Sequence, residues 1–318
     1  MSMNDIIDTI KKNNNIILLC HQNPDGDAIG SVLALYHTLK ELNKDVDMVV
    51  DNPPPRFSFI NGYEDIKTGT NKKYDLGIVV DTANKDRIGS SFNLEKVKTL
   101  IVIDHHMSNT KYGNINYIAK APACCEIIYS LIKNINIKIN KSVATAICTG
   151  LLTDTGGFAH QDVTSNTFLV ASQLSKIINI SDIYKKVLQT ITKSQFELKR
   201  IALDNLELYE NDKIAFSYIT DNDINSVGAT REECDILVNI PMEISSVEVS
   251  IFVRIYDENT RVSLRSTNID VNKIASIFGG GGHINASGIT TEIDYQTLKK
   301  RLIEETRKEI NERNISSK

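Results

Sequence analysis

Apolar runs and helical patterns alternate along the first half of the chain. Apolar runs predict buried strands at 15–20, 46–50, 75–81 and 99–104. The segment 28–43 repeats apolar residues at helical spacing, and 123–134, 141–153 and 166–178 do the same. Such alternation is typical of βαβ units. We therefore expect an α/β fold with a mainly parallel sheet and helices on both faces.

The pattern changes after about residue 190. Residues 193–209 mix charged and apolar positions like one helix, and we interpret 191–212 as a helical linker. Beyond it we expect a strand at 213–219, a hairpin from 247–256 and 261–266, a short helix at 271–278 and a last helix at 295–312. We therefore predict a first domain over 1–190 and a smaller α/β domain over 213–318, across a cleft from the first.

Composition narrows the class of protein. The chain has 318 residues, a formal net charge of -4 and 24% charged residues, so it can form two ordinary domains and has no broad basic surface for long duplex DNA. No apolar stretch reaches the roughly 20 residues that span a bilayer, and no signal peptide is visible. The five cysteines form no Cys-x-x-Cys pair. We expect reduced thiols and a cytoplasmic protein without a membrane partner.

Acidic and imidazole side chains follow three of the predicted strands. His21, Asp25 and Asp27 come after the first strand, and Asp81 ends the third. The fourth strand ends in Asp104, His105 and His106, and Asp154 follows an apolar helical run. The carboxyl ends of strands in an open α/β sheet meet at one crevice, so these groups should lie close together.

Carboxylates and imidazoles together favour a manganese, iron or zinc site. There are enough of these groups for two ions, which can activate a water and neutralise a phosphoryl group. Asp81 could bridge two ions, and His106 could contact the phosphate or protonate the leaving oxygen. Each of these residues, taken singly, also has an ordinary explanation as a helix cap, a turn residue or part of a surface pair. Their combination at successive strand ends favours the metal site.

At these residues the chain resembles the DHH phosphoesterase superfamily. The similar segments begin with His21-x-x-x-Asp25-Gly-Asp27, Asp81-Thr82, Asp104-His105-His106 and Thr153-Asp154. A DHH-associated C-terminal domain is indicated by Val262-Ser-Leu-Arg265-Ser266, by four glycines at 279–282 before His283, and by Ala286-Ser-Gly288. The arrangement is most similar to the bifunctional nanoRNase (oligoribonuclease) and pAp phosphatase group.

The resemblance implies two manganese ions, with magnesium or another divalent ion as the alternative. His21, Asp25 and Asp81 would hold one ion, and Asp27, Asp81, His105 and Asp154 the other. Asp104 belongs to the metal motif but could instead orient a ligand. His106 would lie beside the scissile phosphate, so His106 and Asp81 are the expected catalytic residues.

Substrate binding is expected mainly in the second domain. Consecutive glycines can present backbone amides to an anion, which suggests a phosphate nest at Gly280, Gly281 and Gly282. His283 and Arg265 could add charged hydrogen bonds. In the first domain, Arg87 could contact substrate or brace its loop. A flexible glycine turn and a solvated arginine are the ordinary explanations.

The leading hypothesis is a manganese-dependent phosphoesterase. It would degrade RNA of two to about five nucleotides to nucleoside monophosphates, and would dephosphorylate pAp to AMP. Hydrolysis of pApA or cyclic di-AMP is a closely related alternative, and a non-catalytic nucleotide-binding protein is an alternative from another class. A homodimer is a further expectation from the family.

Overall fold

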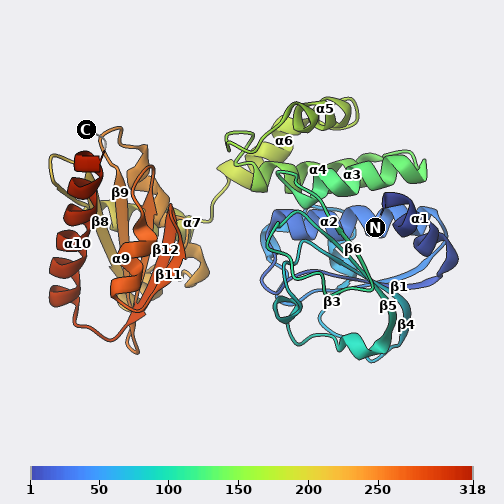
Figure 1. The fold of residues 1–318 in the computed structure, drawn as a ribbon, viewed down its shortest axis with the longest axis horizontal. Helices are drawn as coiled ribbons and strands as arrows, with labels where there is room; N and C mark the ends of the chain where they lie inside the picture. The colour runs from blue at the N-terminus through green and yellow to red at the C-terminus, as the bar shows by residue number, and fades with distance from the viewer. Residues whose placement is uncertain (1, 317–318) are drawn as a thin grey trace. The chain divides into compact units, whose positions relative to one another are not determined.

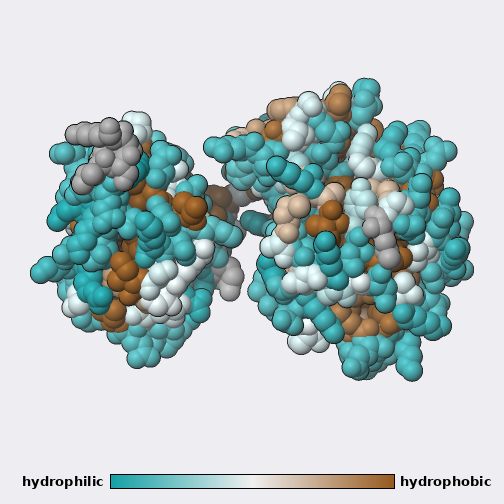
Figure 2. All heavy atoms as spheres, in the orientation of Figure 1, coloured by the Kyte–Doolittle hydropathy of each residue, from teal (hydrophilic) through white to brown (hydrophobic). Residues whose placement is uncertain are grey.

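The computed structural model describes residues 2–316 and divides the chain into two compact units, Met1–Thr190 and Ile191–Lys318 (Figure 1). Each unit contains one six-stranded sheet. Hydrophilic residues cover most of the visible surface of both units (Figure 2). No helix in the described part of the chain is long and apolar enough to cross a membrane.

All strands of the first sheet are parallel, in the order β3-β2-β1-β4-β5-β6. The central strands are almost entirely apolar, as expected for strands that are buried on both faces. The strands are β1 (Asn15–Leu19), β2 (Asp45–Val49), β3 (Ile66–Lys67), β4 (Tyr74–Val80), β5 (Val97–Asp104) and β6 (Ile115–Ile118). The neighbouring strands β1, β4 and β5 therefore end at the same edge of the sheet.

The longer helices of the first unit pack on one face of this sheet (Figure 1). They are α1 (Met3–Lys12), α2 (Gly26–Glu41), α3 (Cys124–Ile135) and α4 (Lys141–Asp154), and α5 (Ser165–Leu174) and α6 (Ile180–Tyr184) pack against α4. Within residues 2–190 the opposite face is covered by Ile88, Phe92 and other residues from loops and short 3-10 turns. The expectation of helices on both faces was therefore wrong, because loop side chains close the second face.

The second sheet is mixed, in the order β11-β12-β10-β9-β8-β7, and only β8 and β9 pair in parallel. Its strands are β7 (Glu207–Tyr209), β8 (Ile214–Thr220), β9 (Val249–Ile255), β10 (Thr260–Ser266), β11 (Gly281–His283) and β12 (Ala286–Thr291). The helices α9 (Val271–Ile277) and α10 (Tyr295–Ser316) contribute to the core on one face. The helices α7 (Lys193–Asp204) and α8 (Asp221–Ser226) contribute to the core on the other.

The expected linker helix over 193–209 is shorter than its pattern predicts. Helix α7 ends at Asp204, and Glu207–Tyr209 forms strand β7, antiparallel to β8. Leu198 and Ala202 of α7 are buried in the core of the second unit. The segment is thus part of a folded unit, because pairing with β8 outweighs the helical periodicity of its last residues.

Close packing between α2 and α4 gives a test of this fold. A Cβ atom at Gly30 of α2 would lie 2.4 Å from the backbone oxygen of Ala146 in α4, so Gly30→Ala must push the helices apart. We expect it to lower the free energy of unfolding by about 1–3 kcal/mol. Gly69→Ala is the matched control, since its nearest neighbour would lie at an ordinary 3.4 Å. Urea unfolding measures both, and equal stabilities would contradict the packing.

Candidate metal centre

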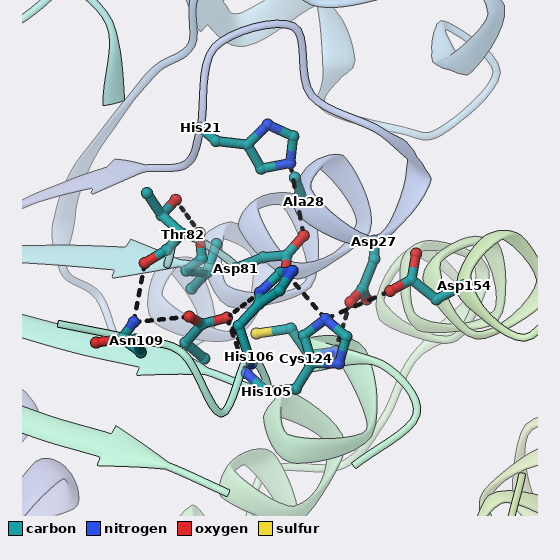
Figure 3. A network of polar contacts seen from close by, with 12 residues as sticks. His21, Asp27, Ala28, Asp81, Thr82, His105, His106, Asn109, Cys124 and Asp154 are labelled. Carbon is teal, nitrogen blue, oxygen red and sulfur yellow. Dashed lines mark hydrogen bonds and ion pairs between the residues drawn. The ribbon is translucent and has the colours of Figure 1, made fainter. Parts of the chain in front are cut away.

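The three neighbouring strands β1, β4 and β5 deliver the polar groups of the site. His21 follows β1 by two residues, Asp81 directly follows β4, and Asp104 is the last residue of β5. The side chains of His21 and Asp81 meet beyond the ends of the strands, with Asp27, His105 and Asp154 beside them (Figure 3), and Asp104 belongs to the same cluster as Asp81. The parallel sheet therefore brings together residues that are up to 133 positions apart in the sequence, from His21 to Asp154.

Asp81 lies at the centre of the cluster. Its Oδ2 is 3.7 Å from Nε2 of His21, and its Oδ1 is 3.3 Å from Nε2 of His105. Oδ1 is buried and has no hydrogen-bond partner in the described part of the chain. Asp81 also has a positive φ of 50°, which is unusual outside glycine and is concentrated at functional sites. A buried carboxylate oxygen in this state fits a cation ligand.

The loop between β1 and α2 supplies two further carboxylates. Asp25 caps α2, and its Oδ1 accepts hydrogen bonds from the backbone amides of Asp27 and Ala28. Asp27 is fully buried, and its two oxygens accept from the amides of Cys124 and Cys125 at the start of α3. The N-terminus of a helix stabilises a negative charge, so α3 supports an ionised Asp27.

Asp154 closes the cluster from the last residue of α4. Its Oδ2 lies 3.5 Å from Nε2 of His105. After it the chain turns away at Gly156 and Gly157, both with positive φ. The backbone oxygen of Asp154 accepts a hydrogen bond from Nδ1 of His160 at 2.7 Å. The glycines thus allow α4 to end with a carboxylate that faces the site.

The histidine rings are oriented by backbone carbonyls. Nδ1 of His21 lies 3.0 Å from the oxygen of Gln22, and Nδ1 of His105 lies 3.0 Å from the oxygen of Ala121. A carbonyl only accepts, so each Nδ1 carries the hydrogen and each Nε2 is free to bind a metal. Both Nε2 atoms face Asp81.

Charge repulsion in the cluster also fits a divalent cation. Burial and the neighbouring carboxylates raise the pKa of Asp27 to about 7 and that of Asp154 to about 10. Burial also opposes ionisation of Asp81, but His105 and His21 hold the pKa of this carboxyl well below its usual range. Burial opposes protonation of His105, yet Asp81 and Asp27 raise its pKa to about 10. A divalent cation would compensate these negative charges without protons.

Ligand atoms of the predicted metal residues cluster in three overlapping groups. Within each group they lie within 4.8 Å of one another. The groups are His21, Asp25 and Asp81; Asp27, His105 and Asp154; and Asp81, Asp104, His105 and His106. The first has the residues of one ligand set that the resemblance implies. The second has those of the other set except Asp81, whose Oδ1 lies 3.3 Å from Nε2 of His105.

Asp104 has a different environment from the other carboxylates. Its Oδ1 accepts from the amide and Nδ1 of His106, both within 3.3 Å, and from the amide of His105 at 2.8 Å. Its Oδ2 accepts from Nδ2 of Asn109 at 2.7 Å. Four donors thus surround this fully buried carboxylate, against two for Asp27, which favours an orienting role of Asp104, toward His106, over its assignment as a ligand.

His106 is the most accessible histidine of the cluster. Its side chain is 37% exposed, against 15% for His105 and 7% for His21. Because Nδ1 is held by Asp104, Nε2 is free. The exposed ring is suited to contact a substrate, in contrast to the two buried histidines.

The contacts of the other predicted substrate-binding residues do not by themselves assign a role to their side chains. Arg87 is exposed, and its backbone oxygen accepts from the amide of Gln22 at 2.7 Å, so its main chain braces the loop of His21. In the second unit, Nη1 of Arg265 donates to the oxygen of Leu264 at 2.9 Å, and His283 is exposed. A substrate role for these side chains stays a prediction.

The expected nest of glycine amides is not formed. The amides of Gly279 and Gly280 donate to Ser276 and Ala275, and the amide of Gly282 donates to Oδ1 of Asn272 at 2.8 Å. Gly281–His283 is strand β11, paired with β12. Three of the four glycine amides thus have partners within the second unit, and a substrate role for Gly280, Gly281 and Gly282 stays a prediction.

The amides of Cys124 and Cys125 are the functional groups that sequence reasoning missed. Both cysteine side chains are fully buried in the core, and their backbone amides bind Asp27. The only signal was the predicted start of a helix near residue 123. Gly150 of α4 is a related omission, because a Cβ there would lie 2.6 Å from Oδ1 of Asp27.

Comparison with known proteins identifies the family. The model of the DHH family N-terminal domain matches residues 15–151, and the DHHA1 domain matches residues 211–312. A probable bifunctional oligoribonuclease and PAP phosphatase NrnA of Streptococcus mutans is 31% identical over 93% of this chain and 98% of its own length. The chain belongs to the DHH phosphoesterase family. It is a hydrolytic enzyme with a DHHA1 domain in its second unit.

Other relatives support the same assignment. The bifunctional oligoribonuclease and PAP phosphatase NrnA of Bacillus subtilis is 31% identical over 89% of this chain and 91% of its own length. The crystal structure of an exopolyphosphatase-related protein from Bacteroides fragilis has a TM-score of 0.86 and 28% identity, and covers 96% of this chain and 95% of its own. The DHH architecture therefore extends over both units.

Replacement of Asp81 tests the metal centre. Asn tolerates a positive φ and keeps the shape of the side chain, so Asp81→Asn should fold while the central negative charge is lost. We expect calorimetry to show Mn²⁺ binding that is weakened roughly 100-fold. This is the upper end of the loss in metal affinity that follows when a residue that only orients a ligand is replaced. Asp75→Asn, at the other end of β4, is the control and should bind like the wild type. Equal binding by both variants would refute the central role of Asp81.

A second variant separates the two roles of Asp104. If Asp104 orients His106, Asp104→Asn should keep the number of bound ions and weaken their affinity about tenfold. If Asp104 is a ligand, Asp104→Asn should bind one ion fewer, or bind Mn²⁺ as weakly as Asp81→Asn does. Metal analysis after dialysis gives the stoichiometry.

Proposed function

We propose that the protein is a manganese-dependent phosphoesterase that degrades very short RNA to nucleoside monophosphates and dephosphorylates pAp. The proposal rests chiefly on one observation, the clustering of ligand atoms from His21, Asp25 and Asp81 beside a second cluster from Asp27, His105 and Asp154. Oδ1 of Asp81 lies 3.3 Å from Nε2 of His105 and so links the two clusters. Two curated relatives that match most of the chain are named as bifunctional oligoribonuclease and PAP phosphatase. Both activities cleave a phosphate ester, so one centre can serve both.

The ligand set supports manganese. Carboxylates alone suit magnesium and calcium, whereas the added imidazoles of His21 and His105 shift the preference toward manganese, iron or zinc. The first ion would be held by His21, Asp25 and Asp81, and the second by Asp27, Asp81, His105 and Asp154. Two such ions would supply an activated water and neutralise the charge of the phosphoryl group.

The residues of the chain have distinct tasks in this mechanism. Asp104 holds Nδ1 of His106 at 2.8 Å and thereby directs Nε2 outward. His106 would hydrogen-bond the scissile phosphate and could give a proton to the leaving oxygen. The carbonyls of Gln22 and Ala121 keep His21 and His105 in the tautomer that binds a cation. The α3 amides that hold Asp27 fix the orientation of its carboxylate.

The substrate panel that tests the proposal contains 5′-phosphorylated RNA of two, three, five and about 24 nucleotides, with pAp and pApA in parallel. We expect Mn²⁺-dependent release of monophosphates from the short RNAs, release of phosphate from pAp, and slow action on the long RNA. A chelator should abolish all turnover, and Asp81→Asn should lower it at least 100-fold. Product chromatography follows each reaction.

The outcomes separate the related functions. Turnover of pApA alone would assign the enzyme to hydrolysis of that dinucleotide and would contradict a general RNA substrate. Equal rates on long and short RNA would contradict the preference for short chains. Full activity in the presence of the chelator would contradict the metal mechanism itself.

A further inference from the structure

The loop that follows strand β2 lies beside the metal centre. Strand β2 pairs in parallel with β1, so its carboxyl end lies at the same edge of the sheet as His21 and Asp25. One contact joins the two loops directly, since Nδ2 of Asn52 donates to Oδ1 of Asn23 at 3.2 Å. The sheet order β2-β1-β4-β5 therefore puts this loop and His106, which follows β5, on opposite flanks of the cluster.

Arg56, which lies in this loop, is one of only two arginines in the first 190 residues, and the other is Arg87. Both follow strands that end at the metal edge, β2 and β4. Lysines supply the other permanent positive charges of this unit. A guanidinium presents a rigid fork of N–H donors that matches the oxygens of a phosphate, whereas an ammonium is a point charge. Arginine at this edge therefore indicates a phosphate more strongly than a lysine would.

The backbone around Arg56 is held in place. Three consecutive prolines precede Arg56, which is the middle residue of the 3-10 turn Pro55–Phe57. Proline fixes φ, and the oxygen of Pro53 accepts a hydrogen bond from the hydroxyl of Tyr63 at 2.8 Å. Phe57 is buried, and Cζ of Arg56 lies 4.7 Å from the centroid of the Phe57 ring, within the range of a cation–π contact. The guanidinium is therefore positioned by a preformed segment.

The guanidinium of Arg56 has no protein acceptor. It forms no hydrogen bond and no ion pair with any residue in the described part of the chain, although a guanidinium is rich in N–H donors. The side chain reaches solvent, yet partial burial lowers the pKa of Arg56, and the charge of Asp25 opposes this shift. Donors that have lost water and have gained no acceptor are costly, which fits a residue that receives an anionic partner.

A counter-ion for Asp25 is the ordinary explanation of an arginine at this place. In that role Arg56 would pair directly with Asp25, and no such ion pair is formed between these two described residues. A direct pair would also occupy the carboxylate that the first ion requires. The charge of Asp25 acts on Arg56 from outside ion-pair contact, so Asp25 stays available to a cation and Arg56 to an anion.

We propose that Arg56 binds an outer oxygen of the phosphate group that the two ions hold for hydrolysis, on the flank opposite His106. The inference rests on the proposed function and adds a further substrate contact to it. Negative charge on the outer oxygens of a phosphate must be stabilised during cleavage, and a positioned arginine does so. His106 from the side of β5 and Arg56 from the side of β2 then hold the group between them.

Binding of inorganic phosphate tests this contact apart from turnover. We expect Arg56→Gln to bind Mn²⁺ like the wild type, and the Mn²⁺-loaded variant to bind inorganic phosphate about tenfold more weakly, since one charge-assisted hydrogen bond is lost. Arg56→Lys keeps the charge and loses the fork, so it should recover only part of the phosphate affinity. Calorimetry measures the binding of both ligands.

Lys138→Gln is the matched control. Lys138 is exposed, and it makes no hydrogen bond or ion pair with the described residues. It precedes α4, and the 14 residues of this helix, about 21 Å, separate it from Asp154 at the metal centre. The substitution removes one positive charge from the same unit, so this variant should bind Mn²⁺ and phosphate like the wild type.

Turnover gives a second measurement. For both the trinucleotide RNA and pAp we expect Arg56→Gln to lower kcat/KM at least about tenfold, because a hydrolysed phosphate is common to both substrates. Lys138→Gln should retain the wild-type values. Thermal unfolding of each variant shows whether a loss reflects misfolding.

Each outcome decides a separate question. Wild-type affinity of Arg56→Gln for phosphate would overturn the contact, while wild-type turnover of short RNA and pAp still upheld the proposed function. An equal loss in Lys138→Gln would reduce the result to general charge and would also overturn the contact. Weaker Mn²⁺ binding by Arg56→Gln would make the loss an effect on the ions and would overturn it as well. No turnover of any substrate by the wild type would refute the proposed function, and the contact with it.

Discussion

Repulsion among buried carboxylates is the constraint on which the first unit depends. Asp27 and Asp81 are almost fully buried, and Asp25 and Asp154 lie close by. Burial and the neighbouring carboxylates raise the pKa of both Asp27 and Asp154, so the arrangement resists simultaneous ionisation. A protein that only had to be stable would not concentrate these charges at one sheet edge. The cost is consistent with a site whose charges are compensated by divalent cations.

The surrounding structure reduces that cost at specific atoms. Two amides at the start of α3 bind Asp27, and the backbone of α2 binds Asp25. Asp104 differs because four donors surround its two oxygens, whereas Asp27 accepts one amide on each oxygen. Carboxylates with lone pairs left for a cation and a carboxylate that protein donors surround therefore occur within one motif. This difference in hydrogen bonding, and not the type of residue, separates candidate ligands from a residue that orients.

The sequence predicted what depends on local periodicity. Strands β1 and β4 and the second half of β5 are nearly continuous apolar runs, so the side chains at their ends could be assigned to one edge. The role of Asp104 and the amides of Cys124 and Cys125 could not be predicted in this way. The partner of Asp27 lies 97 residues away, and no pattern within a strand or helix encodes that contact. For the same reason the apolar spacing of the β7 segment is typical of a helix, although the segment pairs with β8 in the sheet.

The glycine run shows a second limit of local reasoning. Four glycines in a row suggested free amides, yet three of those amides are used by Ser276, Ala275 and Asn272. The glycines differ in the room that each leaves for a Cβ atom. Packing requires a glycine at position 280, whereas it does not require Gly281 or Gly288. Gly280 lets the chain pass close to β12, and the amides of Gly279 and Gly280 bind carbonyls near the end of α9. Neither task is encoded in the glycines themselves, because each depends on a neighbouring element of the folded unit.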